Sequence, residues 1–423
     1  MSGDREHRPL VVMKFGGSSV ANPDRMKNVA RRIIDKKREG NRCVVVVSAM
    51  GDTTDDLIDL SKKINADPPD REMDLLMSAG EQISSALLAM AIQAEGEKAA
   101  AFFAPQLGIR TDSVHTKARI VEIDGTRLQK EITNGNIAVC AGFQGLDASN
   151  DITTLGRGGS DTTAVALAVA LKADVCEVYT DVDGIYTADP RVVPEARKIE
   201  RIYFDEMLEL ASLGAKVMMN RSIEFAKKYN IPLHVRSSLN GNAGSWIIEE
   251  EETPMMERPI VRAVAADKDQ ARITAIDLPD VPGVAAKLFG GLAESNINVD
   301  MIVQSSSEHE IGKNDIAFTV ASTDLKRAVE RLKPVLKDLS GGSIVFSDDV
   351  AKVSIVGVGM RSHAGVAAKM FKSLAAAGVN IEMISTSEIK VSCIISRSKA
   401  DEAVRRLHAA FELGRQAPVA AGA

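Results

Sequence analysis

The N-terminal half of the chain alternates short apolar runs with stretches of helical periodicity. Leu10–Phe15 is an apolar run, and Cys43–Val47 is an uninterrupted run typical of a strand that is buried on both faces. Between them, the apolar residues of 26–34 recur at helical spacing, after Asn22 and Pro23, which are typical of an N-cap and a first helical position. A strand, a helix and a strand in this order predict a parallel βαβ unit with a right-handed crossover.

The same alternation continues to about residue 250. We expect further strands at 137–141, 175–179 and 232–236, and further helices at 73–94, from Asp161, at 203–215 and at 216–229. This order predicts the α/β fold class, with an open, mainly parallel sheet sandwiched by helices.

The second half of the chain contains an internal repeat. Four acidic residues and a proline within 249–254 indicate a solvated linker. Beyond it, Gly283–Phe289 recurs as Gly365–Phe371, and Asn298–Ile302 recurs as Asn380–Ile384, both at an offset of 82 residues. This offset is longer than the roughly 20–50 residues of a solenoid repeat, so we expect two small α+β domains. The predicted domains are residues 1–254, 255–346 and 347–423.

Composition limits the functions that are open to this chain. A formal net charge of −6, from 52 Lys and Arg against 58 Asp and Glu, and an aromatic content of 4% argue against nucleic acid as a partner. The four cysteines form no CxxC pair, so we expect buried thiols in a reducing compartment and no zinc site. The N-terminus lacks the apolar core of a signal peptide, and no run approaches the roughly 18 apolar residues of a membrane span. We therefore predict a cytoplasmic protein with no membrane partner.

Two glycine-rich loops indicate the chemistry. The run 153–163 (TTLGRGGSDTT) places three glycines and Arg157 ahead of an apolar helix, and this combination of N–H groups, helix N-terminus and guanidinium suits an anion. Lys14 beside Gly16–Gly17 forms a second nest of this kind. Taken singly, the first loop is also typical of a turn that caps a buried helix, and Lys14 of a strand-end lysine. Ligands of open α/β sheets bind at the carboxyl ends of the strands, so the two loops together predict one crevice for a phosphate donor and its acceptor.

Two further segments offer polar groups. The acidic segment 180–191 follows the strand that ends at Tyr179 and lacks the later ligands of an EF-hand loop. The loop 280–286 leads into a helix and offers N–H groups to a small anion such as an amino-acid carboxylate, which Asn298, Asp300 and Gln304 would help to bind. Alternatively, the loop 280–286 is a turn that caps a helix of a domain with a purely structural role.

Together these motifs resemble a known family. Lys14–Ser19, Val46–Gly51, the Arg157 loop and Thr180–Arg191 are similar, in this order, to the aspartokinases of the amino acid kinase family, and the C-terminal repeat is similar to tandem ACT domains, which sense amino acids. The resemblance extends from residue 10 to about residue 413. It implies transfer of the γ-phosphoryl group of ATP to the side-chain carboxylate of L-aspartate, giving 4-phospho-L-aspartate for lysine, threonine and methionine biosynthesis. Because that carboxylate is already ionised, catalysis needs positioning and charge neutralisation but no general base.

The resemblance also implies roles for individual residues. Lys14, Asp161 and Arg157 are the implied catalytic residues: Lys14 stabilises charge on the γ-phosphoryl group, Asp161 orients Lys14, and Arg157 binds the α-carboxylate of aspartate. Glu81 accepts from the ammonium group of aspartate. The implied ATP-binding residues are Lys14, Phe15, Gly16, Gly17, Ser48, Ser160, Thr180, Asp181, Tyr186, Arg191 and Lys216. The implied substrate-binding residues are Thr54, Glu81, Thr154, Arg157, Gly158, Gly159 and Ser160. The implied effector-binding residues are Asp280, Gly283, Val284, Ala285, Asn298, Asp300 and Gln304.

Cofactor, partners and assembly follow from the same resemblance. Mg²⁺ is expected to enter with ATP and to need no protein ligand, and lysine, threonine or both are the expected effectors. A homo-oligomer is expected, or association with a short regulatory subunit from an internal start at Met255 or Met256. Relatives also suggest that the two ACT domains interleave, with residues 261–270 pairing with the second. Two alternatives remain: a kinase of the same family with another acceptor (N-acetylglutamate, glutamate or uridylate), or an amino-acid sensor without activity.

Overall fold

In the computed structural model, the chain folds into two compact units. The first consists of Met1–Ile185, Lys198–Ala211 and Lys216–Pro254, and the second of Tyr186–Arg197, Ser212–Ala215 and Met255–Ala423. The structure describes residues 8–214, 217–250, 260–307, 312–339, 342–358, 360, 363 and 365–415. The expected domain boundary at 254/255, with Met255 and Met256, therefore lies outside the described residues.

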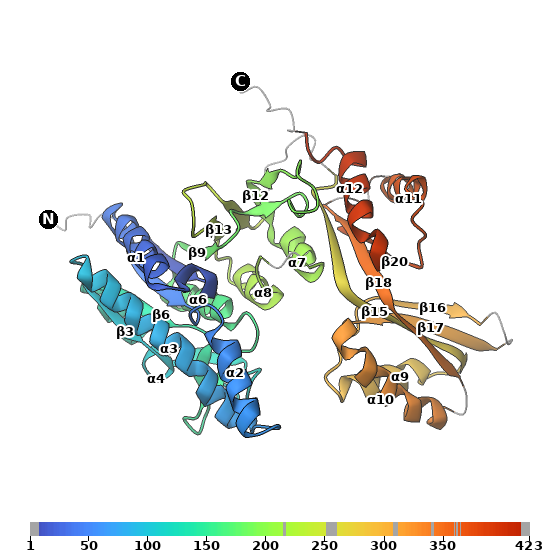
Figure 1. Cartoon of the computed structure of the whole chain (residues 1–423), viewed down its shortest axis with the longest axis horizontal. Coiled ribbons are helices and arrows are strands. Elements are labelled where there is room, and N and C mark those ends of the chain that lie inside the picture. Colours follow the sequence, from blue (N-terminus) through green and yellow to red (C-terminus); the bar gives the residue numbers. More distant parts are fainter. Residues whose placement is uncertain are drawn as a thin grey trace. The chain divides into compact units, whose positions relative to one another are not determined.

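The centre of the first unit is an eight-stranded sheet (Figure 1). Its six strands from β13 to β3 run parallel, and β14 is antiparallel to β13. In sheet order the strands are β12 (Arg201–Tyr203), β14 (Ser245–Ile248), β13 (Leu233–Ser237), β9 (Val175–Thr180), β1 (Leu10–Phe15), β2 (Arg42–Val47), β6 (Ile137–Ala141) and β3 (Ala99–Phe102). The predicted mainly parallel sheet is confirmed, and the predicted strands match the observed ones to within one residue.

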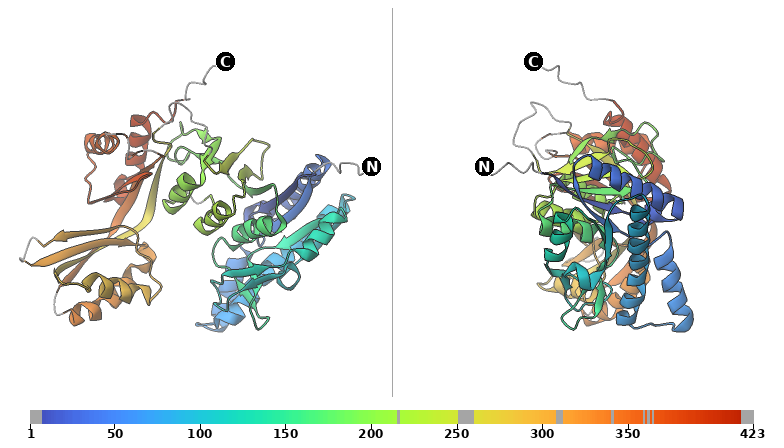
Figure 2. Two further views of the ribbon diagram at one scale, coloured as in Figure 1. Left: turned by 180° about the vertical axis from the view of Figure 1, so that it is seen from behind. Right: turned by 90° about the vertical axis from the view of Figure 1, so that its left-hand side faces the viewer.

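Helices cover both faces of this sheet. On one face, α1 (Pro23–Arg38) and α3 (Asp70–Ala94) bury residues such as Ile33 and Leu88 against Met13 and other apolar side chains of the strands. On the other face, α6 (Gly159–Leu171) packs on β1, β2 and β9 and is almost entirely buried. Figure 2 shows the fold from behind and from one side. Because α6 is buried on all sides, its sequence is apolar around the whole helix and has no amphipathic pattern.

The remaining elements of the first unit are short. A second sheet has the order β5 (Ile120–Ile123), β4 (Ile109–Thr111), β7 (Gln144–Leu146) and β8 (Ile152–Thr154), and β10 (Ile185–Tyr186) forms a two-stranded ladder with β11 (Lys198–Ile199). The other helices are the 3-10 helix η1 (Gly17–Val20), α2 (Thr53–Ile64), α4 (Ala104–Leu107), α5 (Thr126–Thr133), α7 (Phe204–Ser212) and α8 (Asn220–Lys228).

Several helix boundaries differ from the predictions, and α3, for example, begins at Asp70 rather than at residue 73. α6 begins at Gly159, two residues before Asp161, because Gly158 serves as N-cap in the left-handed region at φ 72°. α7 ends at Ser212, short of the predicted residue 215, because Gly214 has φ +92° and breaks the helix. α8 begins at Asn220 rather than at residue 216. By contrast, the Asn22 cap is confirmed, since its side-chain oxygen accepts the Arg25 N–H at 3.0 Å.

The second unit contains a six-stranded antiparallel sheet. In order its strands are β16 (Ile302–Ser306), β17 (Lys313–Val320), β15 (Ala263–Pro279), β18 (Ser343–Val356), β20 (Lys390–Ser396) and β19 (Met383–Thr386). Its helices are α9 (Val284–Ala293), α10 (Leu325–Asp338), α11 (Val366–Ala376) and α12 (Ala400–Ala410), with the short 3-10 helices η2 (Ser322–Asp324) and η4 (Arg397–Lys399).

The repeat in the sequence corresponds to two similar modules on this sheet. α9 and α11 start after Gly283 and Gly365, which have nearly the same left-handed conformation at φ 97° and 98°. The central strands β15 and β18 are long and run through both modules (Figure 1). The start of β15 pairs with the end of β18, with Ala263 beside Val356, and Val264 is buried in the core of the second module. The structure thus places the beginning of β15 with the second module.

The structure bears on two further expectations, the absence of a membrane span and the burial of the four cysteines. α3 is long and apolar enough to cross a membrane by length and composition, a feature that the sequence analysis did not recognise. Half of its apolar window is buried inside the protein, and a single helix of this kind is weak evidence for a membrane span. The four cysteines are free and buried, which confirms the prediction of buried thiols.

Candidate active site

The carboxyl ends of four neighbouring strands meet at one edge of the large sheet. β9, β1, β2 and β6 are consecutive and parallel, so that Tyr179 lies beside Phe15, Phe15 beside Val47, and Val47 beside Ala141. The loops that follow these strands therefore share this edge: residues 16–17, 48–51, 142–143 and 180–181. This is the position at which parallel α/β sheets bind ligands.

Phe15 contributes backbone rather than a side chain to this edge. Its ring is fully buried and stacks on Tyr179, with 4.6 Å between the centroids. Its carbonyl accepts the N–H of Ser48 at 3.1 Å, which fixes the half-buried Ser48 at the end of β2. Gly16 also uses its N–H within the fold, donating to the Tyr179 carbonyl at 3.3 Å.

Gly17 lies where two loops make a close approach. A Cβ at Gly17 would stand 2.8 Å from the carbonyl oxygen of Ala49, so a side chain here would push the loops apart. Gly17 also opens η1, and the first N–H groups of a helical turn have no partner within that turn. The loop therefore presents the start of η1 to a ligand, while the Gly16 amide is already bonded.

Lys14 and Asp161 form an ion pair beside this loop. Side chains alternate along β1, so Lys14 points to the α6 face while Phe15 points to the opposite core. The Lys14 Nζ lies 2.6 Å from Oδ1 of Asp161, which stands in the first turn of α6. The two side chains are only 13% and 9% exposed. The fold thus brings together an ammonium group, a carboxylate and a helix N-terminus from positions 147 residues apart in the chain.

The N-terminus of α6 docks onto the end of β6. The Phe143 N–H donates to the Thr163 hydroxyl at 3.0 Å, and Gly142 lies so close to Ser160 that an added Cβ would be 2.8 Å from the Ser160 Cβ. Gly159 is buried against Phe143 in the same way. Ser160 and Gly159 are therefore held at the shared edge by contacts with the β6 loop.

Arg157 lies on the loop between β8 and α6, and its side chain is exposed. The loop is held by Arg221 of α8, whose guanidinium donates to the carbonyls of Leu155 and Ala118, each at 2.9 Å. Burial lowers the pKa of Arg221. Gly158 has φ 72°, and a Cβ there would come within 1.9 Å of Met219. The sequence did not point to Arg221, because a single arginine on a polar helix has no distinguishing pattern.

Glu81 of α3 reaches the end of β2 from the side. Its Oε1 accepts the Ala49 N–H at 3.0 Å, while its Oε2 is buried and has no partner among the described residues. Burial raises the pKa of Glu81 from its usual 4.5 to about 7, against the opposing effect of the Ala49 hydrogen bond. A buried carboxylate oxygen without a partner is a group that a ligand cation would satisfy. Thr54 lies half-buried in the first turn of α2, the helix that follows the β2 loop.

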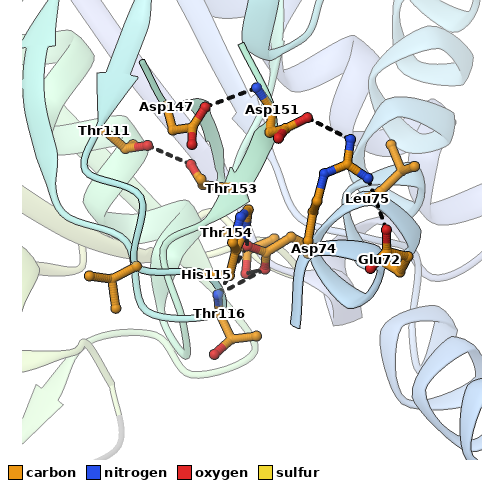
Figure 3. A network of polar contacts seen from close by, with 12 residues as sticks. Glu72, Asp74, Leu75, Thr111, His115, Thr116, Asp147, Asp151, Thr153 and Thr154 are labelled. Atoms are coloured by element: carbon orange, nitrogen blue, oxygen red, sulfur yellow. Dashed lines mark hydrogen bonds and ion pairs between the residues drawn. The ribbon is translucent and has the colours of Figure 1, made fainter. Parts of the chain in front are cut away.

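A buried network surrounds Asp74 (Figure 3). Asp74 is fully buried and accepts from the Thr116 N–H at 3.0 Å, from His115 Nδ1 at 2.8 Å and from the hydroxyl of Thr154. The Thr154 hydroxyl thus donates within the fold, so only its lone pairs remain for a substrate. Asp74 was missed in the sequence because an acid on an apolar helix gives no sign of its partners in β8 and the 112–118 loop.

Four other residues expected at the nucleotide lie in two different places. Thr180 ends β9, and its hydroxyl donates to the exposed Asp181 at 3.0 Å. Tyr186 and Arg191 belong to the segment Tyr186–Arg197 of the second unit, where Arg191 is 90% exposed and forms an ion pair with Asp189 at 2.7 Å. Lys216 lies outside the described residues.

Comparisons with known proteins identify the family. The amino acid kinase family model matches residues 9–237, and the ACT domain model matches residues 273–335 and 353–411. The chain belongs to the amino acid kinase family, among the aspartokinases. The aspartokinase of Mycolicibacterium smegmatis is 51% identical over 406 residues, which is 96% of either chain. The crystal structure of E. coli aspartokinase III in complex with aspartate and ADP has a TM-score of 0.79 at 28% identity and covers 95% of this chain and 99% of its own. The same enzyme in complex with lysine and aspartate has a TM-score of 0.73 with equal coverage.

In the ACT domains of this aspartokinase-family chain, four of the residues expected to bind an effector lie at the start of α9 or just before it. Gly283 caps this helix, Val284 and Ala285 form its first turn, and the exposed Asp280 accepts from the Asn314 side chain at 2.7 Å. Asn298 and Gln304 are exposed, the latter on the edge strand β16.

Asp300 has a partner that the sequence did not reveal. It forms an ion pair with Lys352 of β18, a lysine that is 3% exposed. Glu382, which occupies the corresponding position in the repeat, forms an ion pair with Arg272 of β15 at 3.1 Å. Each ACT domain thus contributes an acid that pairs with a base from a central strand of the other repeat.

Proposed function

We propose that this chain is an aspartate kinase, which transfers the γ-phosphoryl group of ATP to the side-chain carboxylate of L-aspartate and produces 4-phospho-L-aspartate and ADP. This reaction opens the biosynthesis of lysine, threonine and methionine. The observation that carries the proposal is the buried Lys14–Asp161 pair at the carboxyl end of β1, where the first turn of α6 and the Gly16–Gly17 loop meet. Membership of the aspartokinases selects aspartate as the acceptor.

The nucleophile in this reaction is a carboxylate, which is ionised at neutral pH. The protein therefore has to align it with the γ-phosphorus and stabilise the charge on the transferring group. Lys14 places an ammonium group at that position, and Asp161 holds Lys14 there. The N–H groups at the start of η1 and α6 add positive potential. Ser48, Ser160, Thr180, Asp181, Tyr186, Arg191 and Lys216 remain the residues proposed around ATP.

The acceptor is held through its α-amino and α-carboxyl groups. Arg157 forms a bidentate pair with the α-carboxylate, and the free Oε2 of Glu81 accepts from the ammonium group. Thr54, Thr154 and the amides at 158–160 complete this subsite. These contacts leave the side-chain carboxylate of aspartate free to face the phosphoryl group.

Mg²⁺ is the ion proposed to accompany ATP. Among the described residues, no three His, Cys, Asp or Glu side chains gather closely enough to hold a metal by themselves. We propose that the ion is held through the nucleotide phosphates. When bound, Mg²⁺ neutralises charge on the β- and γ-phosphates.

The proposed regulation and environment follow from the ACT domains and the thiols. Lysine, threonine or both bind at the loop 280–286 and inhibit the enzyme. A homo-oligomer that pairs edge strands of the ACT domains, or an association with a short regulatory subunit from an internal start, is the proposed assembly. Four buried free cysteines fit a cytoplasmic location.

One assay tests the function directly. The protein is incubated with ATP, Mg²⁺, L-aspartate and hydroxylamine, which traps an acyl phosphate as a hydroxamate. We expect hydroxamate and ADP in equal amounts, dependent on aspartate. ADP formation with N-acetyl-L-glutamate, L-glutamate or UMP but not with aspartate would show that the chain is a kinase with a different phosphoryl acceptor. No ADP with any of them would indicate a sensor without activity.

The raised pKa of Glu81 predicts how aspartate binding depends on pH. Glu81 must be ionised to accept from the ammonium group, and its pKa is about 7 in the free protein. The KM for aspartate should therefore fall as pH rises toward 7, by about tenfold per pH unit, and level off above it. Glu81→Gln should give a high KM that no longer changes with pH, whereas His115→Gln, which changes a partner of Asp74, should keep the slope. A slope that survives in Glu81→Gln would remove Glu81 from the aspartate site.

The same shift has a consequence for stability. In the unfolded chain the carboxyl of Glu81 ionises near 4.5, whereas in the fold it keeps its proton up to about 7. The free energy of unfolding therefore decreases as pH rises through this interval. Since glutamine cannot ionise, Glu81→Gln should reduce that decrease, which thermal unfolding at a series of pH values measures.

A further inference from the structure

The segment Tyr186–Arg197 lies within the part of the chain that the kinase family model matches, yet it packs with the ACT domains. It leaves the first unit after Ile185 and returns to it at Lys198, at the two-stranded ladder of β10 and β11. Ala188 and Val193 of the segment are 4% and 2% exposed, and they belong to the same apolar core as Met370 of α11 and Leu407 of α12. The segment is thus a structural part of the second ACT domain.

Thr187 forms hydrogen bonds through its N–H, its carbonyl and its hydroxyl group. Its N–H donates to the Arg197 carbonyl and its hydroxyl oxygen accepts the Arg197 N–H, both at 2.9 Å, which closes the segment into a loop. Its carbonyl accepts the N–H of Val264 in β15 at 2.8 Å. Its hydroxyl is also hydrogen-bonded to Nε2 of His408 at 2.9 Å. Thr187 therefore joins both ends of the loop to β15 and to α12.

His408 is suited to a fixed contact of this kind. It is 3% exposed on α12, and burial lowers its pKa, so the imidazole is neutral near pH 7. A second contact lies close by, since Nε of Arg197 donates to the carbonyl of Leu413 at 2.9 Å, shortly after α12 ends. The segment is thereby attached to α12 at one end and to the residues that follow α12 at the other.

This segment carries Tyr186 and Arg191, two of the residues proposed to bind ATP. Tyr186 is covalently next to Thr187, and Arg191 is four residues beyond it. We propose that the Thr187–His408 hydrogen bond positions the ATP-binding segment and makes the affinity for ATP depend on the packing of the second ACT domain. The inference rests on the proposed function only in assigning ATP to Tyr186 and Arg191. Thr187 and His408 act through those two residues and are positioning residues.

The test compares substitutions that remove the hydrogen bond with substitutions that keep it. Thr187→Val removes the hydroxyl at nearly constant shape, and Thr187→Ser keeps it. His408→Leu removes the ring nitrogen, and His408→Gln supplies an amide in its place. All are made in the full chain, and the KM values for ATP and aspartate, kcat at saturating substrates, ATP affinity by calorimetry without aspartate, and thermal unfolding are measured for each.

We expect Thr187→Val and His408→Leu to weaken ATP binding by about tenfold, the usual effect of one buried hydrogen bond, with little change in kcat or in the KM for aspartate. Thr187→Ser and His408→Gln should restore most of the affinity. Leu374 of α11 is fully buried in the same core, so Leu374→Ala controls for loss of stability alone. It should leave the KM for ATP nearly unchanged at moderate temperature.

Two results would overturn the inference. One is an unchanged ATP affinity in folded Thr187→Val and His408→Leu. The other is an equal loss in Leu374→Ala, which would reduce the contact to general stability. Calorimetry with ATP alone distinguishes a failure of this inference from a failure of the proposed function. A protein that binds ATP but forms no aspartyl hydroxamate contradicts the proposed function, and its ATP affinity still tests the role of the Thr187–His408 hydrogen bond.

Discussion

Replacing Lys14 by alanine lowers kcat by about 10²–10³-fold and leaves the protein folded, if Lys14 stabilises the transferring phosphoryl group. The loss should fall on kcat, because the charge on that group is largest in the transition state. Hydroxamate formation at saturating ATP and aspartate measures it. Thermal unfolding shows whether the fold survives the loss of the partner of Asp161.

Lys36 provides a matched control for this experiment. Like Lys14, it is a poorly exposed lysine that pairs with a buried acid of the same sheet, Glu177 of β9, at 2.9 Å. Glu177 and Tyr179 alternate with Val178 along β9, so Glu177 lies on the α1 face, away from Asp161. Lys36→Ala should reduce stability but keep kcat. A near-normal kcat in Lys14→Ala, or an equal loss in Lys36→Ala, would exclude the catalytic role.

Replacing Arg157 by lysine raises the KM for aspartate by about 10–100-fold, even though the charge is kept. The reason is geometric, since an ammonium group cannot form the two parallel hydrogen bonds of a guanidinium with a carboxylate. Steady-state kinetics with aspartate varied at saturating ATP gives this value. The KM for ATP should change little.

Arg71→Lys is the control for Arg157→Lys. Arg71 is also an exposed arginine, and it pairs with Glu72 at 2.9 Å and Asp151 at 2.6 Å. Exposed pairs of this kind contribute little, so the substitution should leave both KM values unchanged. If Arg157→Lys raised the KM for ATP instead of that for aspartate, Arg157 would bind the phosphates and the assignment of the two loops would be reversed.

The large sheet could be predicted because its strands carry strong local signals. β1, β2 and β6 are continuous apolar runs, and parallel pairing follows from the helices between them. The Lys14 and Arg157 loops could be found because glycines and charges cluster in the sequence itself. Helix ends were less predictable, since the break at Gly214 depends on its backbone conformation.

Contacts between distant segments were beyond the sequence. The partnership of Thr154 with Asp74, 80 residues apart, and that of Arg221 with the Leu155 carbonyl leave no periodic pattern. Likewise, nothing in the composition of Tyr186–Arg197 indicates that it packs with residues near 408. These side chains acquire their roles only when the fold brings their partners close, so the roles can be recognised only in the structure.

The pairing of β15 with β18 constrains how the C-terminal half can melt. The two strands are bonded along most of their length, from Ala263 beside Val356 to Ile276 beside Ser343, and each contributes to both hydrophobic cores. If one repeat unfolds, the strands β15 and β18 separate and the other repeat loses part of its sheet. Heat or denaturant is therefore expected to unfold both repeats in one cooperative transition. A ligand that tightens either repeat would therefore protect the amide hydrogens of both against exchange.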